Sequence, residues 1–179
     1  MKRILISIVI VFFSIFLFPA FYSITQSQSL DIEKQEVIYE LPYPGLLPDH
    51  PLYFIKSMRD KFLIFTTRDN QKKARVYLHL SDKHMAASLA LVEKGKEQLA
   101  VRELQKGENF FLEIPSLLKE VKNQGGGFSD QLVVELLQSN AKHRSVISQV
   151  MQNTTQTEIA PLESLLSENA QAMIELQSL

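Results

Sequence analysis

The amino-acid sequence predicts an all-α protein, in which an N-terminal membrane helix precedes an up-and-down bundle of about five helices with a proline-rich strap. Residues 4–18 carry no charge and are apolar apart from two serines. Beyond residue 51, apolar residues recur at steps of three and four, and no stretch shows sustained period-two alternation. The chain has six glycines and no tryptophan, which fits a helical domain better than a sandwich or a barrel.

The N-terminal apolar segment has the length and the flanking charges of a membrane-spanning helix. It extends over residues 4–22, roughly 28 Å at about 1.5 Å per residue, close to the ~30 Å of a bilayer core. Lys2 and Arg3 precede it, and the first charge after it is the carboxylate of Asp31. By the positive-inside rule, the N-terminus stays inside and the rest of the chain is extracytoplasmic. We therefore expect a single-pass protein of the cell membrane.

A cleaved signal peptide is the alternative to a retained anchor. It would have the same basic start and apolar centre, followed by small residues before the cut. Here Phe21 and Tyr22 occupy that position, and Thr25–Ser27 is a poor cleavage site. The retained anchor is therefore favoured, and secretion after cleavage is the other outcome.

These features divide the chain into three parts. Residues 1–22 are the anchor or signal peptide, and residues 23–39 are a polar spacer. Residues 40–179 are predicted to form one extracytoplasmic helical domain, whose first twelve residues are the strap. A chain of that length buries enough surface for an independent core.

Charge and cysteine content exclude several classes of function. Without Lys2 and Arg3, 17 of the 19 basic residues remain against 20 acidic ones, so the exported part has a net charge of −3. Such a chain lacks the basic character of a nucleic-acid-binding protein. Because there is no cysteine, disulfides, a lipid-modified cysteine and thiolate metal sites are excluded.

The strap, residues 40–51, cannot form regular helix because it contains four prolines. We expect its apolar side chains, Leu41, Tyr43, Leu46 and Leu47, to pack against the domain. Pro51 is predicted to be the first residue of a helix that reaches about Thr66, with His50 as its cap and Asp49 beside its positive end. The apolar stripe of this helix comprises Leu52, Ile55, Met58, Phe62 and Phe65.

A long helix is predicted to follow, capped by Asp69 or Asn70 and ended by Gly95. The next helix starts near Lys96, and Pro115 predicts a kink or break near Glu113.

Three consecutive glycines, residues 125–127, then mark a loop. Ser129 is predicted to cap the fourth helix, and a last helix follows residues 153–155.

The strap and the helix after it resemble a bacterial extracytoplasmic helical domain of unknown function. Leu41–Lys56 carries its Leu-Pro-Asp-His-Pro-Leu-Tyr strap, Lys73–His84 is similar to its long helix, and Ala141–Val146 is similar to a later lysine-histidine helix. The long helix departs from the pattern at Ser81 and at Lys83-His84. The resemblance spans about residues 42–151 and implies a helical fold behind a signal or a single span, with no known activity. The strap motif itself consists of Leu47, Pro48, Asp49, His50, Pro51, Leu52, Tyr53 and Lys56.

The four histidines offer the main place to look for a metal site, although we predict no metal and no cofactor. His79 and Asp82 share a helix face, whereas His84 lies about 140° around the helix from His79. A site would need His79, Asp82 and His143 to meet across helices. No Glu-x-x-His pair of di-iron bundles and no His-Glu-x-x-His motif is present.

The sequence also lacks the motifs of common hydrolases and nucleotide-binding proteins. There is no Gly-x-Ser-x-Gly elbow, and the glycine loop lacks the Gly-Lys-Ser/Thr of a phosphate cradle. We therefore predict a non-catalytic, membrane-tethered or exported interaction or structural module, whose partner is an envelope protein or a second copy. The alternative is an envelope-stress or metal-responsive helical binder or chaperone of the periplasmic type.

Overall fold

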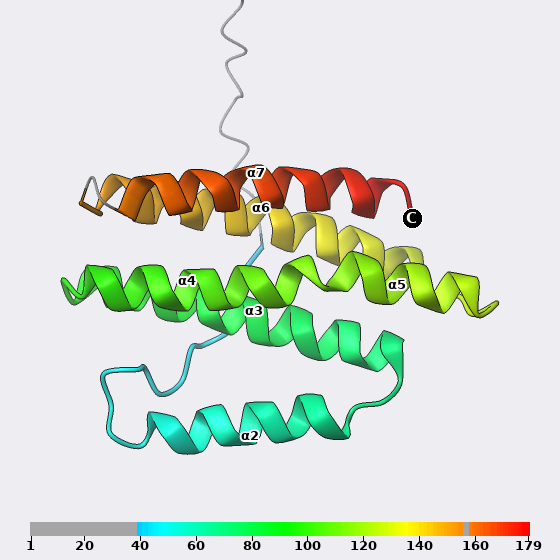
Figure 1. Ribbon diagram of the computed structural model, residues 1–179, viewed down its shortest axis with the longest axis horizontal. Coiled ribbons are helices and arrows are strands. Elements are labelled where there is room, and N and C mark those ends of the chain that lie inside the picture. The colour runs from blue at the N-terminus through cyan, green and yellow to red at the C-terminus, as the bar shows by residue number, and fades with distance from the viewer. Residues whose placement is uncertain (1–38, 156–157) are drawn as a thin grey trace, which may run out of the picture. The chain divides into compact units, whose positions relative to one another are not determined.

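The computed structural model describes residues 39–155 and 158–179, and every regular element within them is a helix (Figure 1). The predicted membrane helix and most of the spacer lie outside these residues. Among the described helices, none is long and apolar enough to cross a membrane. Residues 37–179 cluster into one compact unit. Its helices are α2 (Tyr53–Thr66), α3 (Asn70–Glu93), α4 (Glu97–Leu112), α5 (Ile114–Asn123), α6 (Asp130–Gln152) and α7 (Ile159–Gln177).

Glu113 alone separates α4 from α5, and Pro115 lies in the first turn of α5. The prediction of about five helices, with the third broken near Glu113, is therefore confirmed. Helix α5 continues in the direction of α4, and the other consecutive helices run in opposite directions (Figure 1). Helix α3 packs most extensively on α4, and α6 on α7 comes next, while α2 contacts α3 only sparsely. The bundle is thus built from α3, α4–α5, α6 and α7, and α2 lies on its outside.

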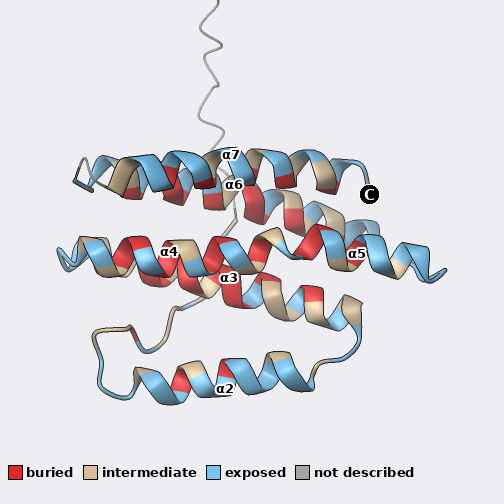
Figure 2. Cartoon of the chain, viewed as in Figure 1, coloured by how far each residue is buried: buried red, intermediate tan, exposed pale blue. Residues whose placement is uncertain are grey.

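Two apolar clusters fill the bundle, one towards each end, and a smaller third cluster lies where the strap meets α3 and α4. The buried positions face inwards (Figure 2). The first is centred on Phe111 and draws on α3 to α7. It comprises Ala74, Leu78, Phe111, Ile114, Leu118, Leu132, Leu136, Ala172 and Leu176. The second comprises Met85, Val101, Leu104, Val146, Ile147, Val150, Leu162 and Leu165. Helix α7 contributes to both clusters, so it completes the bundle.

Local signals set most helix ends as predicted. Asp69 caps α3 by accepting a hydrogen bond from the Lys72 amide at 2.7 Å, and Ser129 caps α6. Gly95 adopts φ +67° after α3. The amide of Lys96 bonds the Leu91 carbonyl at 2.9 Å, which gives the glycine-terminated helix end expected there.

The predicted start of α2 is wrong by two residues. The helix begins at Tyr53, and residues 51–52 form a turn. The His50 ring accepts a hydrogen bond from the Leu52 amide at 3.1 Å, so it supports this turn and does not cap the helix. Asp49 does not lie beside the start of α2 as predicted. Its carboxylate forms ion pairs with Lys94 and Lys96, in the turn between α3 and α4.

The strap packs only in part. Leu47 is buried against α3 and α4, and Leu41 packs on the second apolar cluster. Tyr43, however, is 83% exposed, and Leu46 is exposed as well, so the expectation that all four apolar residues pack is wrong for these two. The Lys56 ammonium donates to the carbonyls of Pro44 (2.8 Å) and Leu46 (3.2 Å), which ties the strap to α2.

Candidate functional site

A layer of polar side chains crosses the bundle between its two apolar clusters. Helices α3, α4, α6 and α7 each supply at least one member from a position that the bundle buries. Along α3, Asp82 lies between Leu78 and Met85, and along α4, Glu108 lies between Leu104 and Phe111. The remaining members are Ser139, Asn140 and His143 of α6 and Asn169 of α7.

His143 is the centre of this polar layer and is fully buried. Its Nε2 lies 2.9 Å from Asp82 Oδ1, and its Nδ1 lies 3.1 Å from Glu108 Oε2. Asp82 also accepts hydrogen bonds from the hydroxyls of Ser139 (2.7 Å) and Tyr39 (2.6 Å). Asn169 donates to the other Glu108 oxygen at 2.8 Å. Both imidazole nitrogens therefore face carboxylates, an arrangement that suits the imidazolium cation.

The electrostatics agree with this geometry. Burial alone would lower the pKa of His143, but the hydrogen bonds and charges of Asp82 and Glu108 outweigh it and raise the pKa to about 9. A protonated imidazole has no lone pair free for a metal, and it is no base. As it stands, the layer can bind a proton tightly and fix the register of four helices, in the way that buried polar groups specify pairing.

The metal candidates do not come together as a set of three. Asp82 and His143 are hydrogen-bonded, whereas the His79 side chain is exposed and does not join them. No group of three or more potential metal-ligating side chains is arranged around a common point within the residues that the structure describes.

A second buried cluster connects α2 to the bundle through Glu103 of α4. This carboxylate accepts from Tyr53 of α2 (2.9 Å) and from Lys106 (2.7 Å), and it lies 2.7 Å from His84 Nδ1. Burial alone would raise the pKa of Glu103, but its bonds to His84 and Lys106 outweigh burial and lower the pKa to about 2. Glu103 is therefore an ionised anchor, and it accepts the Tyr53 hydroxyl at the first residue of α2.

Close packing of α3 on α4 accompanies this cluster. Gly107 faces His84, and a Cβ at position 107 would lie 2.9 Å from the His84 Cβ and 3.0 Å from the Ser81 carbonyl. The glycine is therefore required by the approach of the two helices.

Helix α2 presents its polar side to the bundle and its apolar side to solvent. Lys56 and Asp60 are buried, while the stripe predicted from the sequence is exposed, from 49% for Leu52 to 83% for Phe65. In Figure 2 this helix is mostly pale blue. We call the five most exposed apolar side chains of this helix the α2 outer face: Phe54, Ile55, Met58, Phe62 and Phe65. Three of them are phenylalanines.

Sequence reasoning missed Glu103, Glu108 and Asn169, and it considered His84 only as a partner of His79. A signal was present, because Glu108 and Asn169 stand where the three- and four-residue apolar spacing of their helices expects a core residue. Gly107 inside a helix was a second signal, since an interior glycine usually has a packing reason.

A comparison with family models places residues 45–158 in the family described as Domain of unknown function (DUF5667). The chain belongs to this family. The match extends from the strap to the residue before α7, so α7 adds to the bundle from outside the DUF5667 region. No curated protein and no solved structure matches the chain. The family description gives a domain without an assigned activity, and this agrees with the resemblance to a domain of unknown function.

Proposed function

We propose that this DUF5667 protein is a non-catalytic interaction or structural module, tethered to the cell membrane by its N-terminal segment or exported, and that it works through the α2 outer face. The observation that carries the proposal is the orientation of α2. Five large apolar side chains on one helix are between 53% and 83% exposed. Isolated apolar residues are common on surfaces, but a contiguous set is typical of an interaction site.

The size of this face supports a contact role. At about 200 Å² for each large side chain, the five residues expose on the order of 600 Å², the upper end of the largest patch on a typical monomer. Burying half of that area would contribute roughly 8 kcal/mol before the costs of association. A contact that covers the face therefore offsets a large part of the cost of association.

The buried titratable groups support a non-catalytic role. His143 and His84 each face carboxylates inside the bundle, and the first has both nitrogens occupied. Acid-base or metal chemistry at His143 would first require these bonds to break. The alternative of a metal-responsive binder gains no support from this arrangement, and a chaperone role would use the same α2 outer face.

The test is site-specific photocrosslinking of the full-length chain in its own cells. A photoreactive residue replaces Phe62 in one variant and Ile174 in the control, because Ile174 is also apolar and 60% exposed but lies on α7. We expect a defined crosslinked product from position 62 and none from position 174. Equal or absent crosslinking at both positions would refute a role for the α2 outer face. Many unfolded chains captured at position 62 would favour the chaperone alternative. Retention of the protein in membranes after an alkaline wash tests the tether.

A further inference from the structure

We propose that the α2 outer face lies on an anionic lipid surface, so that α2 is an interfacial helix beside the membrane. The inference rests on the proposed function and names the partner of the same face. Three observations carry it: the narrow apolar arc of α2, the cations at both borders of that arc, and the tether predicted from the sequence.

The most exposed apolar side chains of α2 occupy one narrow arc, and Leu63, 40% exposed, lies outside it. At about 100° per residue, the five members of the α2 outer face fall within an arc of about 100° centred near Met58. The buried Lys56 and Asp60 lie roughly opposite. An amphipathic helix that lies in a membrane interface has this kind of division, with most of its bulky apolar side chains on one side.

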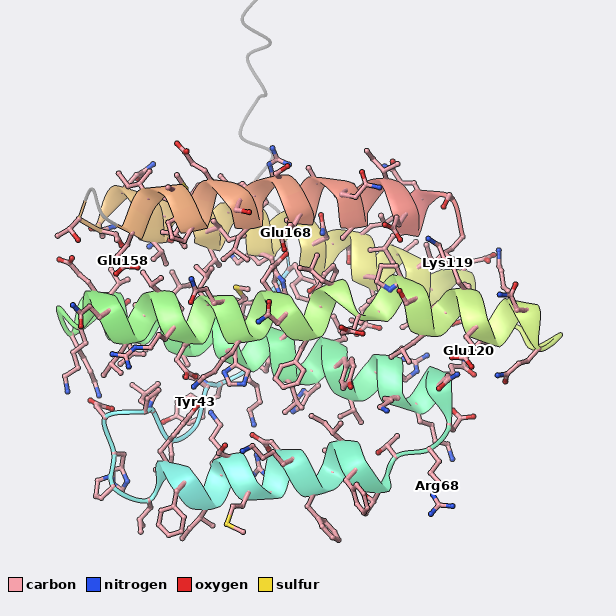
Figure 3. The ribbon with its side chains drawn as sticks, in the orientation of Figure 1. Tyr43, Arg68, Lys119, Glu120, Glu158 and Glu168 are labelled. Carbon is pink, nitrogen blue, oxygen red and sulfur yellow. The ribbon has the colours of Figure 1, made fainter. Side chains whose placement is uncertain are left out.

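Cations border the arc on both sides. Lys61 lies about 60° from Met58 in one direction and Arg59 about 100° in the other. Arg59 bonds Asp60 at 2.6 Å, yet its side chain is still 62% exposed. Figure 3 shows Arg68, in the turn after α2, pointing away from the bundle. Long basic side chains beside an apolar face suit lipid headgroups, because their stems cover apolar surface while their charges meet phosphate.

The local charge contrasts with that of the whole chain. Residues 52–68 contain four basic residues and one acid, Asp60, and so carry a net charge of +3 in a chain of net −1. Because Asp60 is buried, the solvent-facing charges of α2 are all positive. A second copy would meet this face with the same patch, and its cations would find no exposed acid on α2. Charge complementarity therefore favours an anionic surface over self-association.

The predicted tether supplies proximity to such a surface. From Tyr22, where the apolar segment ends, to Tyr39, where the described residues begin, the chain spans at most about 60 Å. A helix on so short a tether meets the bilayer at a high effective concentration, so a weak interfacial affinity is sufficient.

The experiment uses single-cysteine labelling of the full-length chain, which has no cysteine of its own. Met58→Cys carries an environment-sensitive fluorophore on the α2 outer face, and Ile174→Cys carries it on α7 as the matched exposed control. Each protein is reconstituted into vesicles of phosphatidylglycerol and phosphatidylcholine, or of phosphatidylcholine alone. We expect the label at position 58 to shift to the blue and to be quenched by lipid-borne quenchers in the anionic vesicles, and less so in the neutral ones. The label at position 174 should stay in water in both.

A variant without the two bordering cations measures how much they contribute to docking on the anionic surface. Replacing Arg59 and Lys61 with glutamine should lower the ratio of docked to free α2 about 25-fold, at about fivefold for each cation near an anionic surface. An unchanged ratio would overturn the electrostatic part of the inference.

Flotation of the vesicles separates the possible failures. A chain that floats with the position-58 label in water overturns the lipid contact and leaves the proposed interaction module standing. If the label at position 58 is shielded from water in the absence of lipid, and more so at higher protein concentration, the lipid contact is also overturned. That result would indicate contact with a second copy of the chain. A chain that does not float overturns the tether of the proposed function together with this inference.

Discussion

His143 should make the stability of the bundle depend on pH in a range where few other groups titrate. Its pKa is about 9 in the folded protein, because Asp82 and Glu108 favour the charged ring, against an ordinary value of 6.5. Between these two values the folded state binds a proton that the unfolded state has released. The contribution of His143 to the free energy of unfolding is therefore fully present below pH 6.5 and is lost as the pH rises through 9. This difference in the pKa of His143 between the folded and unfolded states corresponds to about 3 kcal/mol of folding free energy.

The assay is urea unfolding of residues 37–179, prepared without the N-terminal segment, at several values between pH 6 and pH 9.5. Both apolar clusters lie within this unit, so it is expected to fold alone. His143→Gln should be less stable at pH 6 and should lose most of the decline in stability with pH. His79→Gln is the control, because that histidine is exposed, and its curve should run parallel to the original one.

Two tyrosines limit the upper end of this pH range. The pKa values of Tyr39 and Tyr53 are raised by burial and by their bonds to Asp82 and Glu103. Both therefore add a further decline in stability only above about pH 10, where tyrosine ionises in the unfolded chain. Curves for His143→Gln and the unsubstituted protein that stay parallel from pH 6 to pH 9.5 would refute the charged-ring interpretation.

Three further predictions concern packing and helix ends, each measured by urea unfolding of the same unit. Gly107→Ala should lower the free energy of unfolding by about 1–3 kcal/mol, since its Cβ would meet atoms of α3 at 2.9 and 3.0 Å. Gly127→Ala, with no atom within 4 Å, should be nearly neutral, and equal losses would contradict the close approach. Asp69→Ala should cost about 1 kcal/mol as a lost cap, and an unchanged midpoint would argue against that cap. Phe111→Ala should cost about 3–5 kcal/mol, whereas Phe62→Ala should cost less than about 0.5 kcal/mol, and a large loss from the second would mean that α2 packs differently.

The helix ends that could be predicted are those where one residue supplies the local chemistry. Asp69 and Ser129 cap because a side-chain oxygen reaches an amide three residues on, and Gly95 ends α3 because it adopts a positive φ. The start of α2 escaped prediction, because Pro51 is compatible both with a first helical turn and with the turn that actually precedes Tyr53. Competing local structures of similar energy cannot be separated without the tertiary contacts of the strap.

The polar layer was only partly predictable for a different reason. Asp82 and His143 could be named as chemically interesting residues, but their meeting depends on the rotation of α3 and α6 about their axes. The role of His143 depends further on Glu108, which sits on a third helix and adds the second carboxylate. A single sequence shows that a polar residue stands at a core position, but it does not show which partners satisfy it. Of the three residues that the sequence proposed, Asp82 and His143 therefore meet and His79 does not, while Glu108 is the partner of His143 that the sequence did not indicate.

The orientation of α2 follows from tertiary contacts that its hydrophobic periodicity does not contain. The stripe from Leu52 to Phe65 predicts an amphipathic helix equally well whether that stripe faces a core or solvent. The apolar stripe faces outwards because polar contacts on the opposite side of α2 hold that side against the bundle and the strap. Tyr53 is held by the ionised Glu103, and Lys56 is held by two strap carbonyls, so the first turn of α2 is fixed with its polar side inwards. Turning the apolar stripe inwards would leave the buried Glu103 without its tyrosine donor and would break the link to the strap. The outer face is therefore exposed because polar contacts fix the rotation of the helix, which leaves its apolar surface available for a partner.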